Sequence, residues 1–353
     1  MRRSFFDKNY FCLYKYNYLM NLEDRINAFT DLGDLLSNNF FLNYSELIER
    51  ACLNNPWFTL LSVKQSLESW GNQLNNNALH AWLDPYNLSD TVKEYNVLVI
   101  MAGNIPLVGF HDLLAVLISG HKVTLKLSRN DSILLPIIIK ILIDIEPEFK
   151  SKIKLISDIK GVSFDAVIAT GSDTSVSYFN YYFNKSRNII RGSRSSIAII
   201  DGKESKKDLD GLTSDIFSFF GLGCRSVSKL FVPEGYDFDL LFKSFYPYSS
   251  FLEHTKYANN YDYNKAMLTM GNNKFIENGF FIMKEDVSLF SPVGMIYYEY
   301  YNDYDYIDSF IANNKNKLQC IVSRNHLPFG SAQNPNLWDY ADNIDTIEFL
   351  RSL

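Results

Sequence analysis

Residues 97–127 read VLVIMAGNIPLVGFHDLLAVLISGHKVTLKL, and the pattern of this stretch decides the expected fold. Two short apolar runs, at 97–101 and 123–127, flank a segment at 110–119 that has the apolar spacing of a buried helix. The alternation continues with a helical segment at 132–148 and apolar runs at 153–156 and 166–169. Strands that alternate with helices predict a parallel sheet covered by helices, with ligands at the carboxyl ends of the strands.

The sequence on either side of this stretch divides the chain into four expected regions. Residues 1–94 are predicted as a helical segment that packs on the first sheet, with a helix that begins after Met20 and Asn21 as its cap. A charged link at 203–210 separates two α/β regions. The predicted bounds are 95–202 for the first domain, 203–325 for the second, and 326–353 for a segment that returns to the first domain or to a subunit interface.

Composition and charge exclude several classes of protein. The 353 residues include 34 Lys and Arg against 40 Asp and Glu, a net charge of −6 without a basic block, so we expect no nucleic-acid partner. Four cysteines lack CxxC and zinc-finger spacing, which argues against disulfides and a metal site. The most apolar stretch, 133–145, is interrupted by Pro136 and Lys140 and is too short to span a bilayer.

The N-terminal residues predict no cleavable leader. Aromatic residues before Met20 follow no clean period, and no small-residue cleavage site accompanies them. We therefore expect a cytoplasmic protein without a transmembrane segment. We also hypothesise that translation starts at Met20, which an intact mass that includes residues 1–19 would exclude.

Two turns carry candidates for catalysis. The segment 219–226, FFGLGCRS, places Cys224 on a glycine-flanked turn, where exposed amides can stabilise a thiolate and an oxyanion and Arg225 would favour the thiolate. Asn104, in the turn 101–107, can direct its amide N–H at developing negative charge. Taken alone, each turn also fits a purely structural role. Lone cysteines are mostly buried apolar residues, and Gly, Asn and Pro are common in turns.

Two further turns carry candidates for binding phosphate or ribose. Lys126, Ser128 and Arg129 end the second predicted strand, where they can hold anionic oxygens. Gly171 and Ser172 precede a helix whose N-terminus can bind a diphosphate. A solvated strand end and an ordinary turn are the alternatives, because charges usually lie outside and no GxGxxG accompanies the second turn.

The order of these four turns resembles the aldehyde dehydrogenase superfamily over residues 95–232. More narrowly, AGNIP at 102–106, FGLGCRS at 220–226 and PFGSAQ at 328–333 are similar to the LuxC-type acyl-CoA reductases, as are the closing stretches 337–342 and 345–350. The resemblance implies an aldehyde dehydrogenase-like α/β fold, with two parallel-sheet, Rossmann-like domains and a helical N-terminal segment. It implies that the first domain binds the cofactor and that the second carries the nucleophile.

By position, the resemblance implies a role for each candidate. Cys224 would be the acyl-accepting nucleophile and Asn104 the oxyanion donor, with the backbone amide of Cys224 as second donor. Lys126 would hold the adenosine side of the cofactor, and Ser128 would be a further cofactor-binding residue. Gly171 and Ser172 would belong to the cofactor loop.

Three departures from hydrolytic aldehyde dehydrogenases qualify the resemblance. IRGSRS at 190–195 stands where those enzymes keep a Glu-Leu-Gly-Gly run, so the water-activating glutamate is absent. SLFSPV at 288–293 resembles their Glu-x-Phe-Gly-Pro-Val run without its glutamate, which puts the usual grip on the nicotinamide ribose in doubt. Arg129 stands where an acidic residue often binds the adenosine ribose, and a cation there predicts NADPH.

The implied reaction is the NADPH-dependent reduction of a long-chain acyl thioester, acyl-CoA or an acyl-protein thioester, to the aldehyde through an acyl cysteine. Implied partners are an acyltransferase or acyl-protein synthetase and a second copy of the chain. No metal is needed, and His111, His121 and His326 are expected to be structural or exposed rather than acidic catalysts. The alternatives are a non-catalytic scaffold subunit of an acyl-transfer complex and a hydrolytic aldehyde dehydrogenase.

Overall fold

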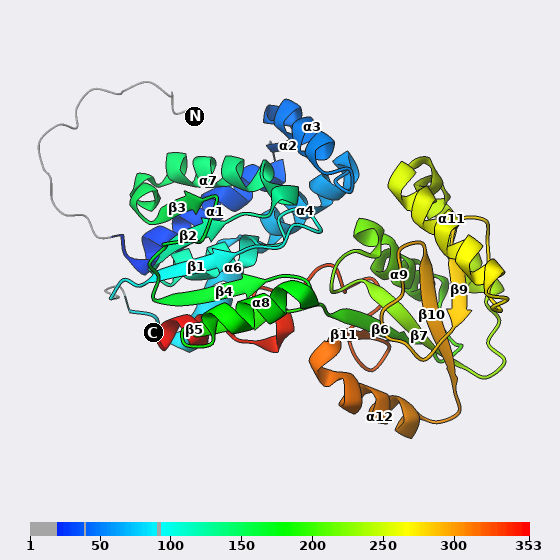
Figure 1. Cartoon of the computed structure of the whole chain (residues 1–353). Coiled ribbons are helices and arrows are strands. Elements are labelled where there is room, and N and C mark those ends of the chain that lie inside the picture. The colour runs from blue at the N-terminus through cyan, green and yellow to red at the C-terminus, as the bar shows by residue number, and fades with distance from the viewer. Residues whose placement is uncertain (1–19, 39, 90–92) are drawn as a thin grey trace, which may run out of the picture.

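The computed structural model describes residues 20–38, 40–89 and 93–353, which form two sheets, each with its own covering of helices (Figure 1). The hypothesis of a start at Met20 depends on residues 1–19, which lie outside the described residues. The first sheet has the order β3-β2-β1-β4-β5, and all neighbouring strands in it are parallel. These strands are β1 (Asn96–Ile100), β2 (Lys122–Lys126), β3 (Ile153–Ile156), β4 (Ala166–Thr170) and β5 (Arg187–Arg191).

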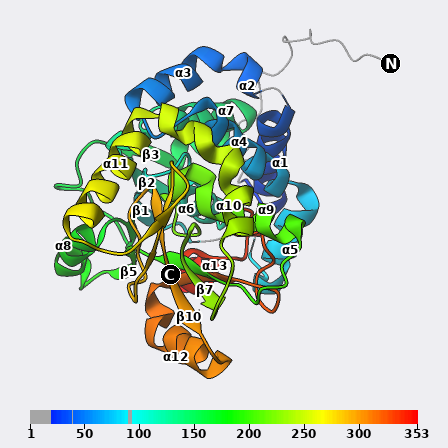
Figure 2. The ribbon, with the colours of Figure 1, turned by 90° about the vertical axis from the view of Figure 1, so that its right-hand side faces the viewer.

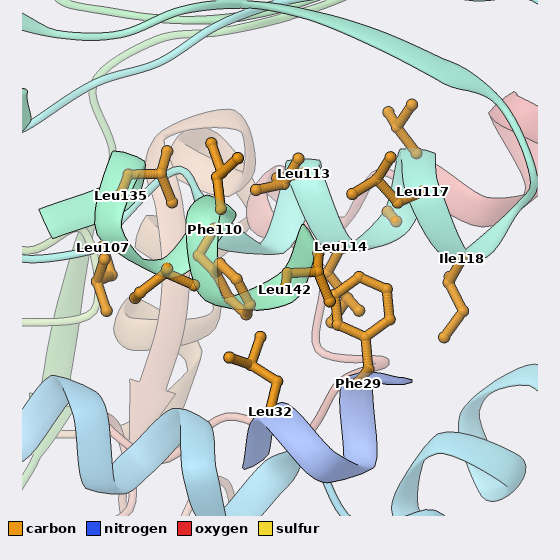
Figure 3. Close-up of a cluster of buried hydrophobic side chains, with 14 of the residues drawn as sticks. Phe29, Leu32, Leu107, Phe110, Leu113, Leu114, Leu117, Ile118, Leu135 and Leu142 are labelled. Carbon is orange, nitrogen blue, oxygen red and sulfur yellow. The ribbon is translucent and has the colours of Figure 1, made fainter. Parts of the chain in front are cut away.

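Helices from the N-terminal region and from the crossovers cover one face of the first sheet. They are α1 (Leu22–Asn38), α2 (Phe40–Asn43), α3 (Ser45–Asn54), α4 (Leu60–Gln73), α5 (Asn76–Leu83), α6 (Phe110–Ile118) and α7 (Leu134–Ile145). Eight of the nine residues of α6 are buried, because this helix lies between the sheet and the N-terminal helices. Figure 3 shows Phe29 and Leu32 of α1 pointing toward the leucines of α6 and α7 in this core.

Helix α8 (Asp173–Phe183) covers the opposite face of the first sheet. Its Phe183 packs with Leu98 of β1 and Val167 of β4, whereas Val97 and Val99 belong to the other core. Both faces of the central strand are therefore buried. This explains why 97–101 reads as a continuous apolar run without polar alternation.

The second sheet has six strands in the order β11-β6-β7-β10-β9-β8, and only the short pair β8 and β9 is antiparallel within the described residues. The strands are β6 (Ser195–Ile199), β7 (Val227–Pro233), β8 (Ile276–Glu277), β9 (Ile282–Glu285), β10 (Met295–Tyr301) and β11 (Leu318–Val322). Its helices are α9 (Lys206–Phe217), α10 (Asp239–Phe245), α11 (Thr255–Met270) and α12 (Tyr304–Asn314). Helix α12 packs on one face of this sheet, and α9 and α10 pack on the other (Figure 2).

Two boundaries predicted from the sequence differ from the structure. The expected link at 203–210 is wrong, because α9 begins at Lys206 and its N-cap Ser205 accepts from the backbone N–H of Asp208 at 3.2 Å. Charges in the first turn of an amphipathic helix therefore resembled a linker. The change of sheet also comes before the predicted boundary after residue 202, since β6 pairs with β7 and β11 of the second sheet.

The C-terminal segment returns to the first core. Helix α13 (Thr346–Arg351) packs on α6, with Ile347 and Leu350 buried. A buried ion pair holds this corner, since Arg191 of β5 donates to Asp112 of α6 at 2.6 Å and to Thr346 Oγ1 at 2.8 Å. The guanidinium of Arg191 thus links β5, α6 and α13, which are far apart in the sequence.

Asp112→Asn keeps the volume of this side chain but leaves the Arg191 guanidinium buried without a counter-charge. We expect the free energy of unfolding in denaturant titrations to fall by about 3 kcal/mol. Arg351→Ala removes an exposed ion pair with Glu348 and serves as the matched control, with no expected change in the unfolding midpoint. A loss below about 1 kcal/mol for Asp112→Asn would show that the pair does not hold this corner.

Candidate active site

A groove with a volume of about 960 Å³ lies between the two sheets, at the carboxyl ends of β1, β2, β4 and β5. The turns after these strands line it together with one face of α4, the turn 222–225 and part of 333–342. All seven site residues singled out from the sequence line this groove: Asn104, Lys126, Ser128, Arg129, Gly171, Ser172 and Cys224. The structure therefore brings them together where a parallel sheet usually places its ligand.

The turn that carries Asn104 is held by a buried carboxylate. Asp131 accepts from the backbone N–H of Leu107 at 2.8 Å, and burial raises the pKa of Asp131 to about 6. Leu107 has a positive φ of 59°, a conformation that persists only where the surrounding contacts hold it. Asn104 itself donates from Nδ2 to Leu222 O at 2.7 Å, so its turn is joined directly to the turn of Cys224.

The approach to Cys224 from α9 is a left-handed turn. Phe219, Phe220 and Gly221 have successive φ values of 54°, 57° and 74°, which only glycine adopts without strain. The ring of Phe220 packs on Phe251, with 4.4 Å between the ring centroids, and this contact helps to hold the turn. The chain thereby reverses between α9 and β7 and brings Cys224 to the groove.

The backbone around Cys224 is held by short-range hydrogen bonds. Ser226 N donates to Gly223 O at 3.0 Å, and Ser196 Oγ of β6 donates to Cys224 O at 3.0 Å. A Cβ atom at Gly223 would lie 3.4 Å from Ser226 Oγ, an ordinary van der Waals distance, so hydrogen bonds rather than crowding hold this turn. The turn therefore has one tight conformation, while the thiol stays half-buried at the groove.

The thiol of Cys224 is not a ready thiolate. Burial raises its pKa above the ordinary value of 9.0, and Cys320 and Asp342 also raise it, whereas Arg225 lowers it. Arg225 therefore acts on the pKa in the direction expected from the sequence, and burial outweighs its effect. Arg225 donates to Asp339 O at 2.9 Å, which keeps its charge beside the groove.

The other part of the groove offers groups for anions. Lys126 and Arg129 form no ion pair with any residue that the structure describes. Ser172 caps α8, whose N-terminus faces the groove, and a Cβ at Gly171 would lie 2.8 Å from Ser175 Cβ. This part of the groove suits a nucleotide diphosphate. Unpaired cations and a helix N-terminus attract the negative charge, and a glycine leaves room for the phosphate to approach the backbone.

The two stretches that lack the expected glutamates differ in their position relative to the groove. Arg191 and Arg194, in the stretch 190–195, line the groove but pair with Asp112 and Asp342. None of residues 288–293 lines it, so this segment supplies no grip on a ligand there. The described part of the chain also holds no cluster of His, Cys, Asp and Glu side chains suited to a metal ion.

The three histidines considered as acids have structural contacts. The ring of His111 shares a hydrogen bond with Leu337 O at 2.9 Å, and burial lowers its pKa, so it is neutral at pH 7. His121 contacts Leu350 O at 3.1 Å, and His326 contacts Ser323 Oγ at 2.8 Å. Of the three, only His111 lines the groove.

Sequence reasoning missed the residues that support the site from outside the groove turns. Asp131 and Asp215 are buried acceptors for backbone N–H groups, and no spacing in the sequence distinguishes them from surface aspartates. Gln333 was seen only as part of PFGSAQ, although its side chain lines the groove beside Cys224. That stretch was the one signal that could have drawn attention to it.

Comparisons with known proteins identify the family and the fold. The family model for acyl-CoA reductases of the LuxC type matches residues 21–240, and no sequence among the curated proteins matches the chain. Aldehyde dehydrogenase 21 from Physcomitrella patens, solved with the product succinate, is 16% identical, with a TM-score of 0.60 over 86% of this chain and 74% of its own.

Two bacterial structures show the same likeness. The NAD+ complex of an aldehyde dehydrogenase from Bacillus cereus is 13% identical, with a TM-score of 0.60 over 86% of this chain and 72% of its own. An NAD-dependent aldehyde dehydrogenase from Sinorhizobium meliloti is 13% identical, with a TM-score of 0.62 over 86% and 70%. At such identities the likeness concerns the fold, and it confirms the expected aldehyde dehydrogenase-like architecture.

The raised pKa of Cys224 predicts slow alkylation at neutral pH. The rate of reaction with iodoacetamide, followed at Cys224 by peptide mapping, should keep rising as the pH increases past 9. Arg225→Ala should lower the rate at pH 8 by roughly three- to tenfold, because the thiolate loses a neighbouring cation, and Arg225→Lys should restore most of it. Identical profiles for all three proteins would remove the electrostatic role of Arg225.

Proposed function

The chain belongs to the LuxC family of acyl-CoA reductases, and from this premise we propose that it reduces an acyl thioester to an aldehyde with NADPH, through a covalent acyl-Cys224. Membership and fold make it an oxidoreductase that acts on aldehyde or acyl groups. One observation carries the finer proposal. Cys224 and Asn104 line one groove, and their turns are joined by the hydrogen bond from Asn104 Nδ2 to Leu222 O.

The chemistry assigned to Cys224 and Asn104 follows from this contact. Cys224 Sγ attacks the thioester carbonyl carbon and gives up its proton to solvent. Asn104 Nδ2 keeps one N–H on Leu222 O and donates its second N–H to the oxyanion that develops. The carbon–sulfur bond to the donor thiol then breaks, and that thiol departs with a proton. Cys224 is left acylated.

The second half of the reaction forms the aldehyde. NADPH, when bound, supplies the hydride that reduces the acyl group. Asn104 again faces the oxyanion, now that of the thiohemiacetal on Cys224, whose collapse releases the aldehyde and the thiolate. The raised pKa of Cys224 favours reprotonation of the free thiol after release.

The groove favours thioester reduction over hydrolytic oxidation of an aldehyde. Hydrolysis of the acyl enzyme needs a base to activate water. In the stretch 190–195, where hydrolytic relatives keep a glutamate, the groove is lined by Arg191 and Arg194, and both are engaged by aspartates. A carboxylate base is thus missing from that stretch.

The residues on the other side of the groove fit the proposed NADPH. Lys126 and Ser128 would hold the adenosine side, Gly171 and Ser172 the diphosphate, and Arg129 the 2′-phosphate. A 2′-phosphate gives the exposed, unpaired Arg129 a partner that NADH lacks.

Several finer properties stay predictions. They are long-chain acyl specificity, a donor that is acyl-CoA or an acyl-protein thioester, an acyltransferase or synthetase partner, a homo-oligomer and a cytoplasmic location. Within the described residues, no helix is long and apolar enough to cross a membrane.

The acyl-enzyme step is tested by incubating the protein with radiolabelled long-chain acyl-CoA without cofactor. Label should appear on Cys224 by peptide mapping, and added NADPH should discharge it as aldehyde. Cys224→Ser should abolish discharge and turnover while NADPH binding persists. Cys320→Ser, which changes the neighbouring half-buried thiol, should keep the label.

Absence of label on Cys224 with acyl-CoA and with acyl-loaded carrier protein would overturn this proposal. The scaffold alternative would then be preferred. Steady formation of acid from aldehyde without CoA would instead support the hydrolytic alternative.

The choice of cofactor is tested at Arg129. Arg129→Ser should lower kcat/KM for NADPH about tenfold or more, because the 2′-phosphate loses a charge-assisted contact. The value for NADH should stay within about twofold. Arg129→Lys serves as the control that keeps the charge. Equal losses for both cofactors would contradict recognition of the 2′-phosphate.

A further inference from the structure

The segment 328–333 is fastened to α9 by a buried carboxylate. Asp215, which is fully buried, accepts from Gly330 N at 2.7 Å through Oδ2 and from Ala332 N at 3.0 Å through Oδ1. A Cβ at Gly211 would lie 2.8 Å from the carbonyl carbon of Phe329, so helix and segment pack backbone against backbone. The position of the next side chain, that of residue 333, is therefore closely defined.

The side chain of Gln333 reaches the turn that carries Cys224. Its Nε2 donates to Ser226 Oγ at 3.3 Å, and its Oε1 lies 3.9 Å from the place where a Cβ of Gly223 would be. Ser226 is only 1% exposed, and its backbone N–H closes the turn on Gly223 O. Gln333 thus bonds the last residue of the four-residue turn 223–226 and lies beside its first residue.

Two side-chain amides therefore bracket Cys224. Asn104 Nδ2 holds Leu222, two residues before the thiol, and Gln333 Nε2 holds Ser226, two residues after it. The first amide comes from the first sheet, and the second comes from the segment after β11 of the second sheet. Because strained residues precede the turn, external contacts of this kind are needed to keep one conformation.

We propose that Gln333 is a positioning residue for Cys224. Through its hydrogen bond to Ser226 it holds the turn 223–226 so that the thiol faces the groove. Asp215 serves this role indirectly, because it fixes the backbone from which Gln333 extends. The proposal rests on the proposed function only in taking Cys224 as the nucleophile.

The experiment is a double-mutant cycle with Gln333→Ala, Ser226→Ala and the double variant. Alkylation of Cys224 by iodoacetamide at pH 8, mapped by peptide, measures the reactivity of the thiol without any substrate. Kinetics with acyl-CoA and NADPH give kcat and each KM. Asn334→Ala, the next and exposed residue, is the matched control and should behave as wild type.

We expect each single variant to slow alkylation and kcat about tenfold, because a displaced nucleophile loses its productive orientation. Each KM should stay within about twofold, and the double variant should be no slower than either single one, since both remove one interaction. Gln333→Asn keeps the amide but shortens its reach, so it should resemble Gln333→Ala. Should Ser226→Ala fail to fold, Ser226→Gly, which also removes the hydroxyl, takes its place in the cycle.

Two results would overturn the proposal. A raised KM for acyl-CoA with unchanged alkylation would mean that Gln333 binds substrate instead of positioning the thiol. Losses that multiply in the double variant would mean that Gln333 does not act through Ser226. If wild type fails to reduce any acyl thioester, the proposed function fails, and alkylation alone still decides the role of Gln333.

Discussion

Buried carboxylates that accept backbone N–H groups hold the loops of this groove in place. Loops at strand ends have no ladder of hydrogen bonds, so their amides need other acceptors. Asp131 supplies one for the turn of Asn104, and Asp215 supplies two for the segment that leads to Gln333. Burial raises the pKa of each to about 6, so ionisation carries an energetic cost that the backbone contacts reduce.

The seam between the sheets depends on these anchored loops. Asn104 lies in the turn after β1 of the first sheet, and Leu222 lies in the turn before β7 of the second. The 2.7 Å hydrogen bond between them requires that both backbones are held in place. Strain at Leu107 and at Phe219–Phe220 is compatible with such anchoring, because the surrounding contacts determine the conformation. The site thus consists of a few exposed amides and one thiol on a rigid support.

Desolvation gives the groove its chemical character. The partial burial of Cys224 at the groove raises the pKa of its thiol, and one neighbouring arginine does not compensate. In the proposed reaction, the thioester carbonyl is a good electrophile with a good leaving group. A thiol that is mostly protonated at neutral pH is therefore better suited to a thioester than to a less activated substrate. The buried pair of Arg191 and Asp112 also ties the groove to α13, so the C-terminus contributes to this environment.

The alternation of apolar runs and helical spacing was enough to predict the parallel first sheet, and the resemblance pointed to seven residues that the structure brings to one groove. Apolar spacing could do this because it records whether each residue faces a core. It could not show that β6 joins the second sheet, nor that charged residues at 206–210 begin α9.

Only the tertiary structure decided the contacts of Asp215 and Gln333 and the net direction of the Cys224 pKa. Asp215 meets its partners across more than a hundred residues of sequence, and the raised pKa depends on how much water packing excludes. A sequence pattern states which side chains are available. Their partners, and the dielectric around them, exist only once distant segments have packed together.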